Sequence, residues 1–136
     1  MRRRSTIVLL ALAALLVVLG YVGRGVWDGG PPSKPLVVVV PELSPGAREG
    51  AEAFDRRCGK CHGRHAAGTT LGPPLVHLVY RPAHHADVAF VLAVQRGVAA
   101  HHWRFGDMPP QRGMPPGEIE TITRYVRELQ RANGIE

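Results

Sequence analysis

The sequence predicts an all-α protein: a small domain of three to four helices, preceded by one apolar helix at the N-terminus. Three segments carry helix signals, and none shows the alternation of apolar and polar residues that marks a half-buried strand. The chain has 136 residues, which is room for one small domain. Its 16 glycines and 12 prolines disfavour a coiled coil or a regular bundle, so we expect helices separated by long loops.

The N-terminal apolar run predicts a transmembrane helix within residues 1–24. Residues 7–23 (IVLLALAALLVVLGYVG) carry no charge and follow Arg2, Arg3 and Arg4. The run exceeds the ~7–15 apolar residues of a cleaved signal peptide, and no A-x-A-like site follows it, so we favour an uncleaved signal anchor over cleavage. The arginine excess keeps this end in the cytoplasm, which puts the rest on the periplasmic or extracytoplasmic side of the inner membrane.

A linker is predicted over residues 25–43. Its glycines and prolines, beginning with residues 29–32 (GGPP), interrupt any helix and favour an extended chain. Residues 36–40 (LVVVV) are the apolar exception. We expect them to form a short strand or an extended segment that lies on the following domain, with a docking strip for a partner as the alternative.

Residues 44–136 are predicted to form the helical domain. The expected helices run from about residue 45 to 57, from 86 or 87 to 96, and from about 116 to 133. Ser44 followed by Pro45 is typical of an N-cap and a first-turn proline, whereas Gly97 and Gly134 are typical stops. The last helix has one apolar face, formed by Ile119, Ile122, Val126 and Leu129. Long loops leave a thin apolar core, so we expect something else to fill the centre.

The distribution of charge argues against a nucleic-acid partner. The formal net charge is +6, but four of the 17 basic side chains (Arg2, Arg3, Arg4 and Arg24) flank the apolar run. The other 13 face 11 acidic residues, so the body of the chain is nearly balanced. A broad cationic face of the kind that binds phosphates is therefore not expected.

Residues 58–62 (CGKCH) point to the chemistry of the domain. C-x-x-C-H is the attachment sequence for a covalently bound haem: the thiols of Cys58 and Cys61 form thioether bonds, and His62 reaches the iron. A thioredoxin-like pair would follow a strand, but the segment upstream is predicted to be helical. A zinc site would need a second ligand pair, and the sequence has no other cysteine. The motif predicts one haem c.

Around this motif the chain resembles the class I c-type cytochromes, a family of mono-haem cytochromes c, over about residues 44–135. Gly50, Phe54 and Cys58 are spaced by four, as in that family's N-terminal helix, where a glycine lets the C-terminal helix cross closely. Ile122 and Tyr125 resemble the residues that meet it. The resemblance implies a cytochrome c fold around one haem.

A second part of the resemblance is the loop of residues 72–75 (GPPL), which is similar to the family's G-P-x-L loop. It implies that the carbonyl of Pro73 accepts a hydrogen bond from Nδ1–H of His62 and so fixes the orientation of the ring. It also places Leu75 among the cofactor-binding residues.

Two methionines are candidates for the axial ligand opposite His62. Met108 and Met114 are each followed by two prolines, which stiffen the loop that presents the sulfur. By the family's spacing to the last helix, the resemblance favours Met108. Met114 stands at the start of that helix, where an apolar residue commonly packs the helix entry against the core. A bis-histidine haem is the alternative.

The other histidines have simpler expected roles. Neighbours on a helix diverge by ~100°, so neither the pair at 84 and 85 nor the pair at 101 and 102 is expected to form a chelate. We expect the first pair in a loop and the second near the haem edge or its propionates. His77 is expected to be a satisfied pocket residue. Trp103 is expected either to pack in the core or to donate to a propionate.

The resemblance implies an electron carrier and not an enzyme: a membrane-tethered cytochrome that shuttles single electrons through a haem ligated by His62 and Met108. The implied partners are redox proteins at the membrane, such as an oxidase, a reductase or a quinol-oxidising complex. Two alternatives stay open. In the first, the chain is a haem-bearing subunit of a larger membrane oxidoreductase. In the second, it is a haem-based sensor of small ligands with a labile methionine ligand.

Overall fold

The computed structural model describes residues 11–19 and 36–136. Residues 11–19 are helical. Within these two ranges, no helix is both long enough and apolar enough to cross a membrane. The predicted anchor of residues 1–24 and the first part of the linker lie largely outside the described residues.

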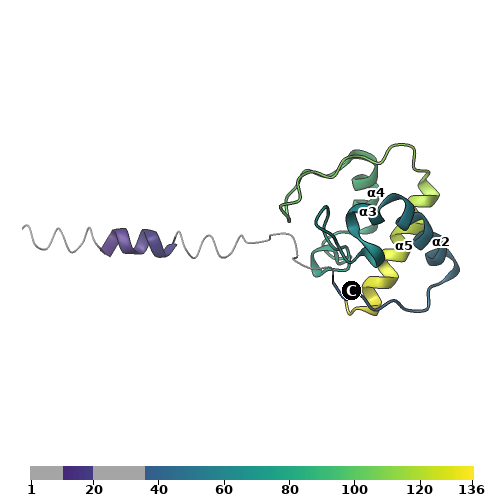
Figure 1. Cartoon of the computed structure of the whole chain (residues 1–136), viewed down its shortest axis with the longest axis horizontal. Coiled ribbons are helices and arrows are strands. Elements are labelled where there is room, and N and C mark those ends of the chain that lie inside the picture. The colour runs from purple at the N-terminus through teal and green to yellow at the C-terminus, as the bar shows by residue number, and fades with distance from the viewer. Residues whose placement is uncertain (1–10, 20–35) are drawn as a thin grey trace, which may run out of the picture.

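The domain is helical, as predicted from the sequence. Its α-helices are α2 (Pro45–Arg57), α3 (Gly59–His62), α4 (Asp87–Arg96) and α5 (Pro116–Ala132), and its 3₁₀ turns are η1 (Arg64–Ala66) and η2 (Leu78–Tyr80). The three helices predicted from caps and periodicity are confirmed as α2, α4 and α5. Ser44 caps α2, since its hydroxyl accepts a hydrogen bond from the amide of Ala47 at 3.3 Å. The loop of residues 98–115 passes from α4 around the edge of the domain to the start of α5 (Figure 1).

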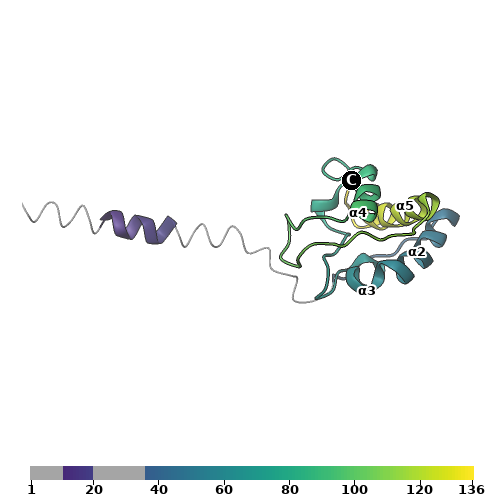
Figure 2. The ribbon, with the colours of Figure 1, turned by 90° about the horizontal axis from the view of Figure 1, so that it is seen from above.

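Helices α2 and α5 cross at very short range, and their contact forms the hydrophobic core. A Cβ atom on Gly50 would lie 1.9 Å from the carbonyl oxygen of Thr121, so only glycine allows this approach. Next to it, the rings of Phe54 and Tyr125 meet edge to face with their centroids 5.6 Å apart. The close crossing expected at Gly50 is confirmed. Figure 2 shows α3 continuing from the end of α2, and α4 beside α5.

The apolar segment of residues 36–40 is extended and lies on the domain, as expected. The amide of Leu36 donates to the carbonyl of Ala67 at 3.0 Å. Asn133 receives a hydrogen bond from the amide of Val39 at 2.9 Å and donates to its carbonyl at 2.8 Å. Val38 packs against the core, whereas Val37 is 97% exposed. The segment is therefore tied to the domain by its backbone and by alternate side chains.

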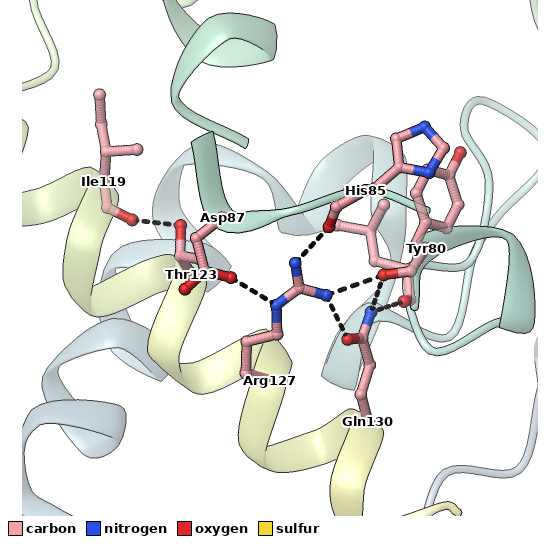
Figure 3. Close-up of polar contacts among 8 residues, drawn as sticks. Tyr80, His85, Asp87, Ile119, Thr123, Arg127 and Gln130 are labelled. Carbon is pink, nitrogen blue, oxygen red and sulfur yellow. Dashed lines mark hydrogen bonds and ion pairs between the residues drawn. The ribbon is translucent and has the colours of Figure 1, made fainter. Parts of the chain in front are cut away.

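Arg127 connects α5 to α4 and to the loop before α4 (Figure 3). Its side chain is buried, and Nε donates to the Asp87 carboxylate at 2.7 Å. The guanidinium also donates to the carbonyls of Tyr80, at 2.8 Å, and of His85. Gln130 accepts a further bond at 2.6 Å. One cationic side chain thus satisfies the polar groups where these segments meet.

Candidate functional site

A largely apolar cavity of about 360 Å³ lies between α2, α4 and the loop that follows α4. Its apolar walls are formed mainly by Phe54, Leu75, Phe90, Val94, Val98 and Ile122. Cys58 and His62 line it from the sequence motif, and Met108 lines it from the loop. The sequence predicts that the centre of the domain has too few apolar side chains to fill it, and the cavity is such a space. The chemistry of the lining suits a large apolar group that also accepts a few polar contacts.

The two cysteines of the motif stand at the junction of α2 and α3. Cys58 follows the last residue of α2, and its amide donates to the carbonyl of Phe54 at 2.7 Å. Burial raises the pKa of its thiol to about 11, and the neighbouring Glu118 and Cys61 act in the same direction. A buried thiol of this kind stays protonated, which is unlike a catalytic or metal-binding thiolate. Cys61 is exposed.

His62 is oriented by a single hydrogen bond. Its Nδ1 lies 2.9 Å from the carbonyl oxygen of Pro73, an acceptor only, so Nδ1 carries the proton. The other ring nitrogen, Nε2, then keeps its lone pair. Burial lowers the pKa of His62, with the bond to Pro73 opposing, so the ring is neutral at neutral pH. A neutral imidazole with a fixed tautomer is the form that binds iron.

The loop between His62 and Leu75 folds back so that Pro73 reaches the histidine. The amide of Gly68 donates to the carbonyl of His62 at 2.7 Å, and the hydroxyl of Thr69 donates to the carbonyl of Cys61 at 2.6 Å. A Cβ atom on Gly72 would lie 2.9 Å from that same carbonyl oxygen. The tight return of the backbone therefore depends on small residues and on hydrogen bonds to the motif itself.

The two candidate methionines occupy different places. Met108 lines the cavity and pairs with Val98 in an isolated antiparallel bridge, with both backbone hydrogen bonds at 2.9 Å. Met114 packs against the hydrophobic core. The structure therefore brings Met108, and not Met114, to the cavity that contains His62.

Comparison with known families decides the identity of the fold. The family model for cytochrome c matches residues 47–130, which include the motif, the cavity and Met108. The chain belongs to the cytochrome c family. It therefore carries covalently attached haem c and is an electron-transfer protein by family. Neither the curated proteins nor the solved structures compared with the chain gave a match.

The lining of the cytochrome's cavity fits this haem. Apart from its apolar walls, the cavity holds the indole of Trp103, whose Nε1–H is buried without a hydrogen-bond partner among the described residues. Burial raises the pKa of the nearby Tyr80 hydroxyl to about 12, and the proximity of the indole N–H acts against this rise. The indole N–H is nevertheless not placed to form a hydrogen bond with Tyr80. A buried donor that the protein does not satisfy is suited to a polar group of the ligand, such as a haem propionate.

The remaining predicted residues are also placed by the structure. Leu75 lines the cavity, as the resemblance implies. His77 lies next to it, where its Nδ1 accepts from the amide of Val79 at 3.2 Å and its ring packs on Trp103. Sequence reasoning missed Phe90 and Val94, which line the cavity from α4. Their spacing of four residues was the available signal.

Proposed function

We propose that this cytochrome is a membrane-tethered mono-haem carrier that passes single electrons between redox proteins outside the cytoplasmic membrane. The observation that carries the proposal is one apolar cavity that contains both the histidine of the attachment motif and Met108. If His62 and Met108 both bound the iron, no coordination site would be open to a substrate, which favours a carrier over an enzyme.

The residues of the chain have distinct roles in this proposal. The haem supplies an iron that changes between the ferrous and ferric states. Cys58 and Cys61 hold it through thioether bonds, and His62 offers Nε2 while the Pro73 carbonyl holds the ring in place. Phe54 and the other apolar residues of the walls exclude water.

Met108 is proposed as the second axial ligand. Its backbone is held by Val98 through two hydrogen bonds, and the two prolines that follow it restrict the chain further. A thioether ligand favours the ferrous state and raises the reduction potential relative to a second imidazole. A fixed sulfur also keeps the coordination the same in both oxidation states, so little reorganisation accompanies electron transfer.

Replacement of each methionine tests this ligand. Met108→Ala is expected to abolish the weak red absorption band of ferric iron bound to methionine sulfur and to lower the reduction potential, because the thioether that favours the ferrous state is lost. Met114→Ala is the matched control, since Met114 packs on the core, and it should keep the band. The measurement is the optical spectrum of each purified, oxidised protein. Loss of the band in the Met114 variant alone would mean that Met114 is the ligand.

The partners are proposed to be an oxidase, a reductase or a quinol-oxidising complex in the same membrane. The near balance of charge beyond residue 24 gives little long-range electrostatic attraction to a partner. A tether compensates for this, because it holds the domain close to membrane complexes at a raised effective concentration.

Membrane tethering is tested by removing the apolar run. The full-length cytochrome should appear in the membrane fraction and need detergent for release, because residues 7–23 are uncharged. The same chain without residues 7–23, exported with a cleavable signal, should be soluble and carry haem. Full-length protein that is found in the soluble fraction with a shortened mass would show cleavage and not anchoring.

A role as a fixed subunit of a larger oxidoreductase is favoured by one observation. Leu36, Val37, Val39 and Val40 are apolar and exposed on a segment that is tied to the domain. Purification in mild detergent separates the two functions, since a subunit should co-purify with other haem or copper chains in a fixed ratio, whereas a carrier should not.

A further inference from the structure

Four histidines from two separate loops lie close together, and three of them (His85, His101 and His102) also line the cavity. His84 and His85 lie just before α4, and His101 and His102 lie in the loop that follows it. From the sequence we expected two separate pairs, neither of them a chelate. The structure adds a juxtaposition that was not expected, because it brings residues of both pairs together: His84, His85 and His102 each have one ring nitrogen within 4.8 Å of the other two.

The separation of the His84 and His102 nitrogens matches that of two ligands on one metal ion. Nε2 of His84 lies 3.4 Å from Nε2 of His102. Two nitrogens bound at about 2.0–2.1 Å to a tetrahedral Zn²⁺ are about 3.4 Å apart. His84 is exposed at the surface, so its ring has room to adjust to a bound ion.

His85 is oriented in the manner of a metal ligand. Its Nδ1 lies 2.7 Å from the carbonyl oxygen of Val79, so Nδ1 carries the proton and Nε2 keeps its lone pair. Histidines that bind metals are commonly held by such a bond from the other ring nitrogen. The cation nearest to this backbone, Arg127, donates to the His85 carbonyl, but its charge is balanced by Asp87 at 2.7 Å.

We propose that His84, His85 and His102 form a binding site for Zn²⁺, with the fourth position taken by water. Three imidazoles are a ligand set that zinc favours over the oxygen-seeking Mg²⁺ and Ca²⁺. A bound ion joins the loop before α4 to the loop that carries Met108. The proposed zinc site shares no residue with His62 or Met108, so its role is additional to electron transfer. A bound ion would fasten the two loops to each other beside the haem cavity.

Zinc titration of the haem-loaded, full-length protein in detergent tests the site. After treatment with a chelator, isothermal titration calorimetry with Zn²⁺ should give one equivalent of binding, which excess Mg²⁺ does not displace. His84→Ala and His102→Ala should each weaken binding by at least about tenfold, the loss that follows removal of even an outer-shell partner at metal sites. His101→Ala is the matched control, because its ring lies beside His102 but outside the group, and its affinity should stay near that of the wild type.

Two further readouts keep the result clear. Zinc should raise the thermal unfolding temperature of the wild type but not of the His84→Ala/His102→Ala double variant. The haem spectrum of the single variant His84→Ala should remain that of the wild type, because His84 is not among the residues that line the cavity. Absence of stoichiometric binding to the wild type, undiminished binding to the double variant, or an equal loss in His101→Ala would each overturn the proposal. A change in the axial-ligand bands on adding zinc would also overturn it, because the histidines would then belong to the haem site.

Discussion

At the scale of single residues, the histidine of the attachment motif is already held by a hydrogen bond within the protein. His62 has one ring nitrogen bound to Pro73, and its burial keeps the ring neutral. Trp103 differs, because its buried indole N–H has no partner among the described residues. Leaving such a donor unpaired costs about 1–3 kcal/mol, so we infer that the haem supplies its acceptor.

Trp103→Phe tests this inference. If the indole donates to a propionate, it reduces the negative charge near the iron, which favours the ferrous state. Its loss should therefore lower the reduction potential by on the order of 20–60 mV, since 1 kcal/mol corresponds to roughly 40 mV for one electron. The measurement is a spectroelectrochemical titration. Phe105→Leu is the control, because Phe105 lines the same cavity without a donor. An equal shift in both variants would contradict the role of the N–H group.

Residue by residue, the sequence predicts contacts that are local or belong to a motif. Cys58, Cys61 and His62 belong to one five-residue motif, which locates them, whereas Pro73 was placed by the resemblance to the family's loop. The approach of His84 to His102 could not be predicted, because it depends on how two loops close around α4. Pairs of histidines analysed separately carry no information about that closure.

At the scale of helices, the packing of α2 on α5 depends on one residue without a side chain. The backbone of α5 at Thr121 fills the place where a Cβ atom on Gly50 would be. This crossing also sets the position of Cys58, two turns further along and just past the end of α2. The helix contact therefore determines where the attachment motif meets the cavity.

Gly50→Ala should destabilise the folded protein by at least about 1–3 kcal/mol, because the two helices must separate to admit a methyl group. Gly117→Ala is the matched control: Gly117 also lies in a helix, but an added Cβ there meets nothing within 4 Å. That variant should be neutral or more stable by about 0.5–1 kcal/mol. Denaturant unfolding of both haem-loaded variants measures the difference. Equal stability of the two variants would show that the close crossing is not required.

The helices that could be predicted are those with their own caps and periodicity. The expected limits of α2, α4 and α5 are confirmed because Ser44, Gly97 and the residues near 116 mark them locally. Helix α3 and the 3₁₀ turns are too short to show a period. The turn η1 lies in the loop that folds back on the motif, where the amide of Gly68 donates to the carbonyl of His62, and η2 begins where the side chain of His77 accepts from the amide of Val79.

At the scale of the whole molecule, the helices contribute unequally to the buried core and to the haem cavity. The buried apolar core is concentrated where α2 meets α5, and Val94, the one buried residue of α4, is not part of that cluster. Val94 instead lines the cavity together with Phe90. Helix α4 therefore faces the haem cavity on one side and is linked to α5 through Arg127 on the other.

Arg127→Met tests how far this connection stabilises the fold. Arg127 is 5% exposed, and its loss leaves the carbonyls of Tyr80 and His85 without this donor and the largely exposed carboxylate of Asp87 without its ion pair (Figure 3). Hydrogen bonds to charged groups contribute about 1.5–3 kcal/mol, so we expect a loss of at least about 2 kcal/mol. Amide hydrogen exchange should rise most in α4 and the loop before it, because these lose their link to α5.

Arg124→Met is the control for Arg127→Met. Arg124 lies on the same helix and pairs with Glu120 at 3.0 Å, but both side chains are largely exposed. Such a pair contributes about 0.3–0.5 kcal/mol, so the control should unfold close to the wild type. A loss confined to Arg127→Met, with faster exchange in α4, would show that α4 depends on this one cation. Unchanged exchange in α4 would mean instead that the haem alone holds that helix in place.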